Sequence, residues 1–193
     1  MALFSLATGI LSVVRLQQLN WDIFSCGWTS APFFGSLTYH HLVVAFYISK
    51  YIEFLDTVFI VLDGKHPIFL HRFHHAGATI ALHLLAATRD EGAIIFLGLN
   101  GFVHAVMYTY YHFSKSLRWM RPFITSGQIL QFLAGFYIYY PFCTTECFWS
   151  DPQKRISFVY QYAFVGVVML FFLKFFVEAY MPKKGKRISE KAA

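Results

Sequence analysis

Charged residues are scarce in this chain. Asp, Glu, Lys and Arg make up 13% of its 193 residues, whereas a soluble domain carries about 25%. So few charges could not cover a surface that faces water, and 57% of the residues are hydrophobic. The apolar runs are long, and the short alternating segments of a transmembrane barrel are absent. We therefore expect an all-α polytopic membrane protein.

Paired cysteines and a clustered basic face are also absent. The three cysteines form no CxxC pair, which argues against a structural zinc site. The net charge of +6 comes from lysines and arginines that stand between and after the apolar runs. Since a nucleic-acid-binding surface gathers such residues on one face, we expect no nucleic acid partner.

Six apolar runs predict about six transmembrane helices in one domain over residues 1–182. The first run, Ala2–Val14, is shorter than the roughly 20 residues that a span needs, and no basic signal-peptide region precedes it. We therefore expect the start of this helix to be missing. The other runs cover residues 38–62, 68–88, 93–113, 122–142 and 156–180, and residues 183–193 form a basic tail.

Lysines and arginines are divided unequally between alternate connections. One side holds four, and the other holds ten. The positive-inside rule places the richer side, with the C-terminus, in the cytosol. All three cysteines then lie on the opposite side. If that side is the lumen of the endoplasmic reticulum, a disulfide is permitted, and Cys26 can pair with Cys143 or Cys147. The ten are Lys65, Arg72, Lys115, Arg118, Arg121, Lys183, Lys184, Lys186, Arg187 and Lys191.

Three histidines stand at the start of the third run. His71, His74 and His75 are spaced i, i+3 and i+4, so on a helix their imidazoles share one face. A single histidine here would be interpreted as a buried core residue. Three on one face, at the edge of an apolar segment, indicate a functional site because titratable groups are costly in that environment.

Three further runs carry polar residues in register. Each set alone has a structural interpretation, since opposite charges three apart can form a packing ion pair and glutamines often only join membrane helices. Together they predict one interior site shared by four helices. The sets are Lys50, Glu53, Asp56 and Thr57; Asn100, His104, Tyr108 and Tyr111; and Thr125, Gln128 and Gln131.

A histidine-lined site inside apolar helices has three chemical interpretations. Membrane di-iron oxidases and desaturases use an HxxHH box, but they need several boxes, and the other six histidines form no second one. A proton-coupled transporter would use the buried charges as a relay. An acyltransferase would use imidazole as nucleophile or base on a lipid substrate. No cysteine lies near the cluster, so an acyltransferase would have to use imidazole as its nucleophile.

Four motifs resemble the fatty acid elongase (ELO) family in order and spacing. They are the Lys50–Thr57 segment KYIEFLDT, the His71–His75 segment HRFHH, the Asn100–Tyr111 segment NGFVHAVMYTYY and the Thr125–Gln131 segment TSGQILQ. The resemblance implies a fold of seven helices, six of them around a narrow tunnel. The opening residues resemble the middle of the family's second helix, so the first helix is expected to be missing.

The resemblance also implies an activity, the very-long-chain 3-oxoacyl-CoA synthase of the endoplasmic reticulum membrane. This enzyme condenses an acyl-CoA with malonyl-CoA, releases CO2 and CoA, and binds no cofactor or metal. Its implied partners are the reductases and the dehydratase of the elongation cycle, and a homo- or hetero-oligomer stays open. Chain-length preference is not predicted by the motif spacing.

We assign roles on the basis of this resemblance. His74 would accept the acyl group as an acyl-imidazole, His71 and His75 would position or deprotonate it, and His104, anchored by Asn100, would act on the malonyl group. Basic residues at the cytosolic mouth would suit CoA phosphates, although the positive-inside bias also explains them; these are Lys115, Arg118 and Arg121. The residues expected to shape the site are Lys50, Glu53, Asp56, Asn100, Tyr108, Tyr111, Gln128 and Gln131.

Overall fold

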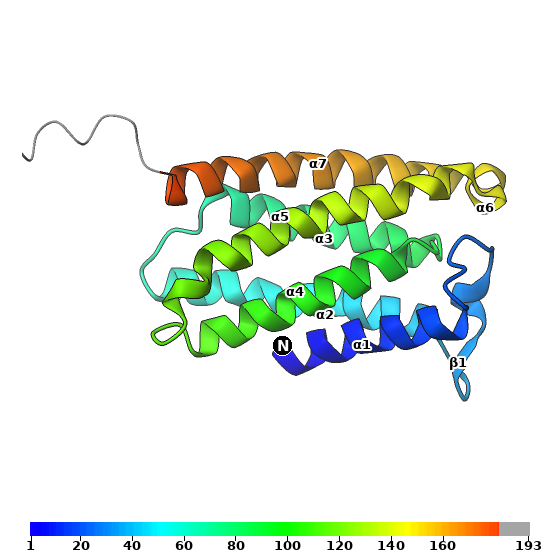
Figure 1. Ribbon diagram of the computed structural model, residues 1–193, viewed down its shortest axis with the longest axis horizontal. Helices are drawn as coiled ribbons and strands as arrows, with labels where there is room; N and C mark the ends of the chain where they lie inside the picture. The colour runs from blue at the N-terminus through cyan, green and yellow to red at the C-terminus, as the bar shows by residue number, and fades with distance from the viewer. Residues whose placement is uncertain (182–193) are drawn as a thin grey trace, which may run out of the picture.

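The computed structural model of the protein describes residues 1–181. Six long helices lie side by side along one axis (Figure 1). Each forms where an apolar run predicted it, and the predicted all-α class is confirmed. The helices are α1 (Ala2–Gln18), α2 (Tyr39–Leu62), α3 (Phe69–Ala87), α4 (Ala93–His112), α5 (Arg121–Tyr139) and α7 (Pro152–Tyr180).

Short elements occupy the connections, and the sequence did not predict them. An antiparallel pair of strands, β1 (Pro32–Phe34) and β2 (Leu37–Thr38), turns at Gly35, whose φ of +58° suits glycine. The remaining short elements are η1 (Trp28–Ser30), η2 (Arg118–Met120), η3 (Tyr140–Thr144) and α6 (Glu146–Ser150).

The helices form a ring in the order α2, α3, α7, α5, α4 and α1. Each packs mainly against its neighbours in this order, and α1 makes its closest approach to α4. Because α2, α3, α7, α5 and α4 are consecutive around the ring, polar residues on the inner faces of α2, α3, α4 and α5 meet across its interior.

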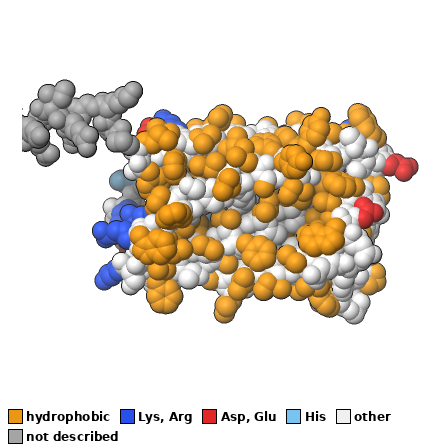
Figure 2. Space-filling model, viewed as in Figure 1, with side chains coloured by type: hydrophobic (Ala, Val, Ile, Leu, Met, Phe, Trp, Pro, Cys, Tyr) orange, Lys and Arg blue, Asp and Glu red, His pale blue; other side chains and the backbone are white. Residues whose placement is uncertain are grey.

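Apolar side chains cover the length of the bundle, and charged side chains collect at its ends (Figure 2). On the face shown, lysines and arginines gather at the end where α4 connects to α5, and acidic residues lie at the opposite end. Of the helices within residues 1–181, α4 and α7 are long and apolar enough to cross a membrane by length and composition. Six spans and a tunnel stay predictions, and the basic tail predicted at 183–193 lies outside the described residues.

The end of the bundle opposite the basic one is tied together by covalent and ionic contacts. Cys26 and Cys147 form a disulfide, which is one of the two pairings that the sequence left open, and Cys143 is free. Glu91 accepts a hydrogen bond from the Gly27 N–H at 2.8 Å and an ion-pair contact from Lys154 Nζ at 2.6 Å. These contacts therefore join three segments into one cap, namely the first connection, the α3–α4 turn and the start of α7.

Asp90, in the turn between α3 and α4, is a buried acid within this cap. Its carboxylate accepts hydrogen bonds from the Tyr139 hydroxyl at 2.8 Å and the Gly92 N–H at 2.8 Å. Burial raises the pKa of Asp90 to about 6, and the two hydrogen bonds oppose the shift only in part. A Cβ on Gly92 would come within 1.9 Å of the Tyr139 ring, so glycine is required for this contact.

Asp90 is expected to make the fold less stable as the pH rises. Its pKa is higher in the folded chain than in the unfolded one, so its contribution is complete below about pH 4 and is lost as the pH passes through about 6. The loss corresponds to about 3 kcal/mol. We expect the melting temperature of the wild type in detergent, relative to Asp90→Asn, to fall between pH 4 and pH 7. A difference that is flat or rises with pH would contradict this.

The α1–α4 contact depends on small residues. A Cβ added to Gly101 would lie 2.7 Å from the backbone oxygen of Ser5 and 2.8 Å from the backbone nitrogen of Gly9. Ser5 itself is buried. Small residues let helix backbones approach closely, which is how membrane helices gain packing energy.

Gly101→Ala is therefore expected to destabilise the bundle, since the obstacle is backbone that cannot rotate away. Overpacking of this kind costs about 1–3 kcal/mol. Gly127→Ala on α5 is the matched control, because a Cβ there meets nothing within 4 Å and alanine favours helix by up to about 1 kcal/mol. Thermal unfolding in detergent measures both. The close contact does not limit stability if Gly101→Ala melts at or above Gly127→Ala.

Candidate active site

The three histidines of α3 share one face, as their spacing predicts. The ring centroids of His71 and His75 lie 4.3 Å apart, and those of His74 and His75 lie 5.7 Å apart. The hydroxyl of Thr57 on α2 lies 2.8 Å from His71 Nε2. Thr57 therefore fixes the orientation of His71, whereas His74 Nδ1 is buried and makes no hydrogen bond among the described residues.

A buried ion pair within α2 is hydrogen-bonded to α4. Lys50 Nζ lies 2.6 Å from Glu53 Oε1 and donates to Asn100 Oδ1 at 3.3 Å. The side chains of Lys50 and Glu53 are only 5% and 2% exposed. This is the ion pair that the spacing permits, and Asn100 adds the acceptor from the neighbouring helix.

The contacts of His104 correct one expectation. Asn100 was expected to anchor His104, but its side-chain oxygen accepts from Lys50 instead. The nearest carboxylate to His104 Nδ1 is Glu53, at 3.8 Å, and that nitrogen makes no hydrogen bond among the described residues. The rotation of α4 turns Asn100 toward α2, so Glu53 rather than Asn100 is in a position to orient the imidazole.

Two more contacts extend the polar surface along α4. The Tyr108 hydroxyl donates to Asp56 at 3.0 Å, and Gln128 Nε2 lies 3.9 Å from the sulfur of Met107. These contacts join α4 to α2 on one side and to α5 on the other. The three polar sets of the sequence thus face the same interior.

A cavity of about 1020 Å³, here called the wide cavity, opens between α2, α3, α4, α5 and α7. All four candidate catalytic histidines line it, and so do most of the residues expected to shape the site. Arg121 also lines it, whereas Lys115 and Arg118 do not. The predicted site residues along its wall are Glu53, Asp56, His71, His74, His75, Asn100, His104, Tyr108, Tyr111, Gln128 and Gln131.

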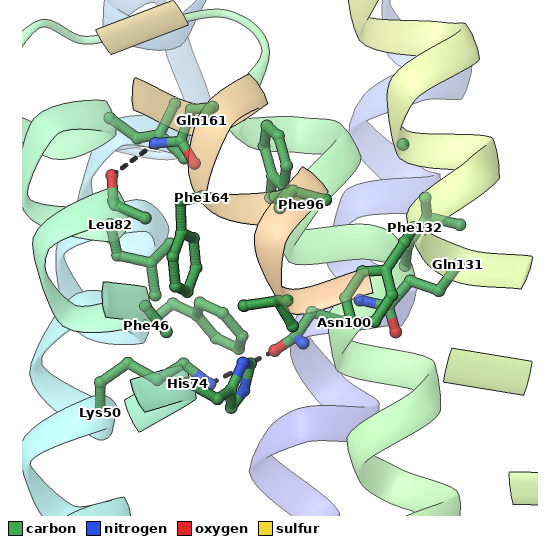
Figure 3. A pocket seen from close by; sticks show the side chains of 17 residues that line it. Phe46, Lys50, His74, Leu82, Phe96, Asn100, Gln131, Phe132, Gln161 and Phe164 are labelled. Atoms are coloured by element: carbon green, nitrogen blue, oxygen red, sulfur yellow. Dashed lines mark hydrogen bonds between the residues drawn. The ribbon is translucent and has the colours of Figure 1, made fainter. Parts of the chain in front are cut away.

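A second cavity of about 70 Å³, here called the narrow cavity, lies beside the first (Figure 3). Its wall is mainly apolar, with Phe46, Leu82, Phe96 and Phe164 among the lining residues. The residues common to both cavities are His74, Asn100, Gln131 and Phe132. His74 is the one histidine of the described chain that lines both, so it lies where a polar and an apolar compartment meet.

Comparison with known proteins now bears on this site. The family model described as "ELO: GNS1/SUR4 family" matches residues 1–188. The chain belongs to the ELO family. The resemblance read from the four motifs is therefore confirmed, and the family supports a role in fatty acid elongation.

Individual relatives agree with the family match. The ELO chain is 33% identical to a putative fatty acid elongase 4 of Caenorhabditis elegans over 171 residues, which are 85% of this chain and 56% of the relative. It is 34% identical to fatty acid elongase 3 of Trypanosoma cruzi over 159 residues, covering 76% and 51%. A very long chain fatty acid elongase 2 of Mus musculus is 27% identical over 206 residues, covering 97% and 68%.

The ELO chain spans about half the length of the first curated relatives it matches. No solved structure matches it. Among residues 1–181, no group of three or more His, Cys, Asp or Glu side chains is arranged to hold a metal ion.

Gln161 on α7 is a cavity residue that sequence reasoning missed. Its Nε2 donates to the Ala81 carbonyl of α3 at 2.7 Å, and its side chain lines the narrow cavity (Figure 3). The sequence did offer a signal, because the segment between Arg155 and Lys174 contains no charged residue and Gln161 is its one side-chain amide. A polar side chain alone in such a run is expected to face the bundle interior.

Proposed function

We propose that this ELO protein is a condensing enzyme that joins a long-chain acyl-CoA to malonyl-CoA and yields 3-oxoacyl-CoA, CO2 and CoA. The observation that carries the proposal is the position of His74 at the boundary of the two cavities. An acyl thioester has a large polar head and an apolar tail. With the head in the wide cavity and the tail entering the narrow one, the thioester carbon would lie at His74.

His74 suits the role of acyl acceptor better than its neighbours. A neutral imidazole attacks through the lone pair of one ring nitrogen. His71 is held by Thr57, whereas His74 makes no hydrogen bond among the described residues and no cysteine lines either cavity. His75, whose ring lies beside both others, would position His74.

His104 and Glu53 would act on the malonyl group. Decarboxylation of a malonyl thioester leaves an enolate that attacks the acyl-imidazole carbon. An imidazole oriented by a carboxylate 3.8 Å away can donate a hydrogen bond to that enolate. His104 lines the wide cavity from α4, which lies across the ring from α3. The acyl group and the malonyl group would therefore be held by different histidines on opposite sides of the cavity.

Arg121 would contact the CoA phosphates at the open end. Its Nε donates to the Tyr110 hydroxyl at 2.6 Å, which fixes the side chain and leaves other guanidinium N–H groups available. We place the enzyme in the endoplasmic reticulum membrane with its C-terminus in the cytosol. The reductases and dehydratase of the cycle would then act on its product.

Replacement of His74 tests the proposal. Membranes that contain the wild type, given labelled malonyl-CoA and a panel of acyl-CoAs, should form a labelled 3-oxoacyl product, and mass spectrometry should find an acyl group on His74. His74→Ala should lose the adduct and at least 10³-fold of the rate, because its nucleophile is gone. His83→Ala is the control, since His83 is exposed and lines neither cavity.

Two results would contradict this assignment. The nucleophile is His75 if His75→Ala loses the adduct and His74→Ala keeps it. The condensing function fails if wild-type membranes form no 3-oxoacyl product while membranes with the Mus musculus relative do so in the same assay.

Gln161 should limit the length of the acyl tail. The lining residues of α3 run from His74 to Leu85, which is roughly 16 Å at about 1.5 Å per residue, and Gln161 is fixed against Ala81 near the far end. Gln161→Ala removes atoms there, so the longest product should gain one malonyl-derived unit. Gln153→Ala, at an exposed position of the same helix, should leave the product spectrum unchanged. An unaltered spectrum in Gln161→Ala would place the tail elsewhere.

A further inference from the structure

The ammonium group of Lys50 is buried in the bundle, and its ion pair with Glu53 does not account for its position. An ammonium carries three donors. Two of them have acceptors, Glu53 at 2.6 Å and Asn100 at 3.3 Å, and Nζ lies 4.3 Å from the centre of the Phe46 ring. Among residues 1–181, Nζ has no third acceptor.

The narrow cavity is the space that Lys50 faces. Lys50, His74 and Asn100 all line this cavity (Figure 3). Lys50 does not line the wide cavity, whereas Glu53 and the three other candidate catalytic histidines do. Its charge is therefore directed to the same part of the boundary as the ring of His74, and away from the open end.

We propose that Lys50 is a catalytic residue, whose ammonium group stabilises the oxyanion formed when His74 attacks the acyl thioester. The proposal rests on the condensing function above. Preorganised donors aimed at a developing negative charge are a large source of rate enhancement, because they need no reorganisation during the reaction. Glu53 and Asn100 supply that preorganisation by holding Nζ from two helices.

The step balances without a further reactant. A ring nitrogen of neutral His74 forms a bond to the thioester carbon, and the π electrons of the C=O bond move to the oxygen that faces Lys50. When the C=O bond re-forms, the C–S bond breaks. The leaving thiolate takes the proton from the other nitrogen of the imidazolium, which gives acyl-imidazole and free CoA. Lys50 keeps all three protons throughout.

The same ammonium would serve the second half of the reaction. Attack of the malonyl-derived enolate on the acyl-imidazole carbon again places negative charge on the carbonyl oxygen. That oxygen has not moved, because the acyl tail stays in the narrow cavity. One donor at the boundary can therefore act in both steps, and it acts on the acyl oxygen rather than on the malonyl carboxylate.

The test is the rate of acyl-His74 formation without malonyl-CoA, a step in which His104 and Glu53 have no malonyl group to act on. Replacing either partner alone would leave the other as an uncompensated buried charge, so both are replaced together and the double variant Lys50→Met/Glu53→Gln is compared with the wild type. The double variant should acylate about 10²–10³-fold more slowly, as for the loss of one oxyanion donor. Its melting temperature and its affinity for acyl-CoA should stay close to those of the wild type, because replacing both members of a buried ion pair is often neutral for stability.

A second double variant, Lys50→Gln/Glu53→Gln, keeps a neutral N–H donor and should acylate at an intermediate rate. A purely structural role for Lys50 predicts that both double variants, once folded, acylate at the wild-type rate, and that result would overturn the proposal. If the wild type forms neither adduct nor 3-oxoacyl product, the condensing function itself fails. If the wild type forms the product and the double variants acylate as fast as the wild type, only the Lys50 proposal fails.

Discussion

The site depends on a charged hydrogen-bond network inside an apolar helix bundle. Lys50 is paired with Glu53 on its own helix and with Asn100 on α4. Each contact is needed because a buried charge without a partner is destabilising by several kcal/mol. The network therefore fixes how α2 and α4 are rotated. That rotation also turns His104 toward Glu53 and brings Tyr108 to Asp56.

The two ends of the bundle differ, since one is closed and the other is open. At the end opposite the basic one, the Cys26–Cys147 disulfide and the Glu91–Lys154 ion pair join three connections into a cap. At the other end, the helices leave a wide cavity with Arg121 in its wall. The narrow apolar cavity lies between these ends, and His74 lies at its entrance. A closed end and an open end suit a substrate that enters by its tail.

Much of this arrangement could be predicted from sequence because it is local. The i, i+3, i+4 spacing of His71, His74 and His75 places them on one helix face in any fold, and the apolar runs fix the helices to within a few residues. Contacts between helices could not be predicted, because they depend on helix rotation. The sequence is equally compatible with a hydrogen bond between Asn100 and His104, on the same helix, and with one between Asn100 and Lys50, on the neighbouring helix. Arg15 shows the same limit, since it follows directly after the first apolar run, Ala2–Val14, yet is buried and donates to the carbonyl of Trp28 at 2.6 Å.

The central claim is that the boundary between the two cavities places the acyl carbon at His74. An experimental structure with a bound non-reactive acyl-CoA thioether tests it most directly. The account predicts that the tail fills the narrow cavity toward Gln161, and that the atom replacing the thioester carbon contacts the His74 ring. A tail that lies in the wide cavity or against the outer surface of the bundle, with His74 remote from the head group, would contradict it.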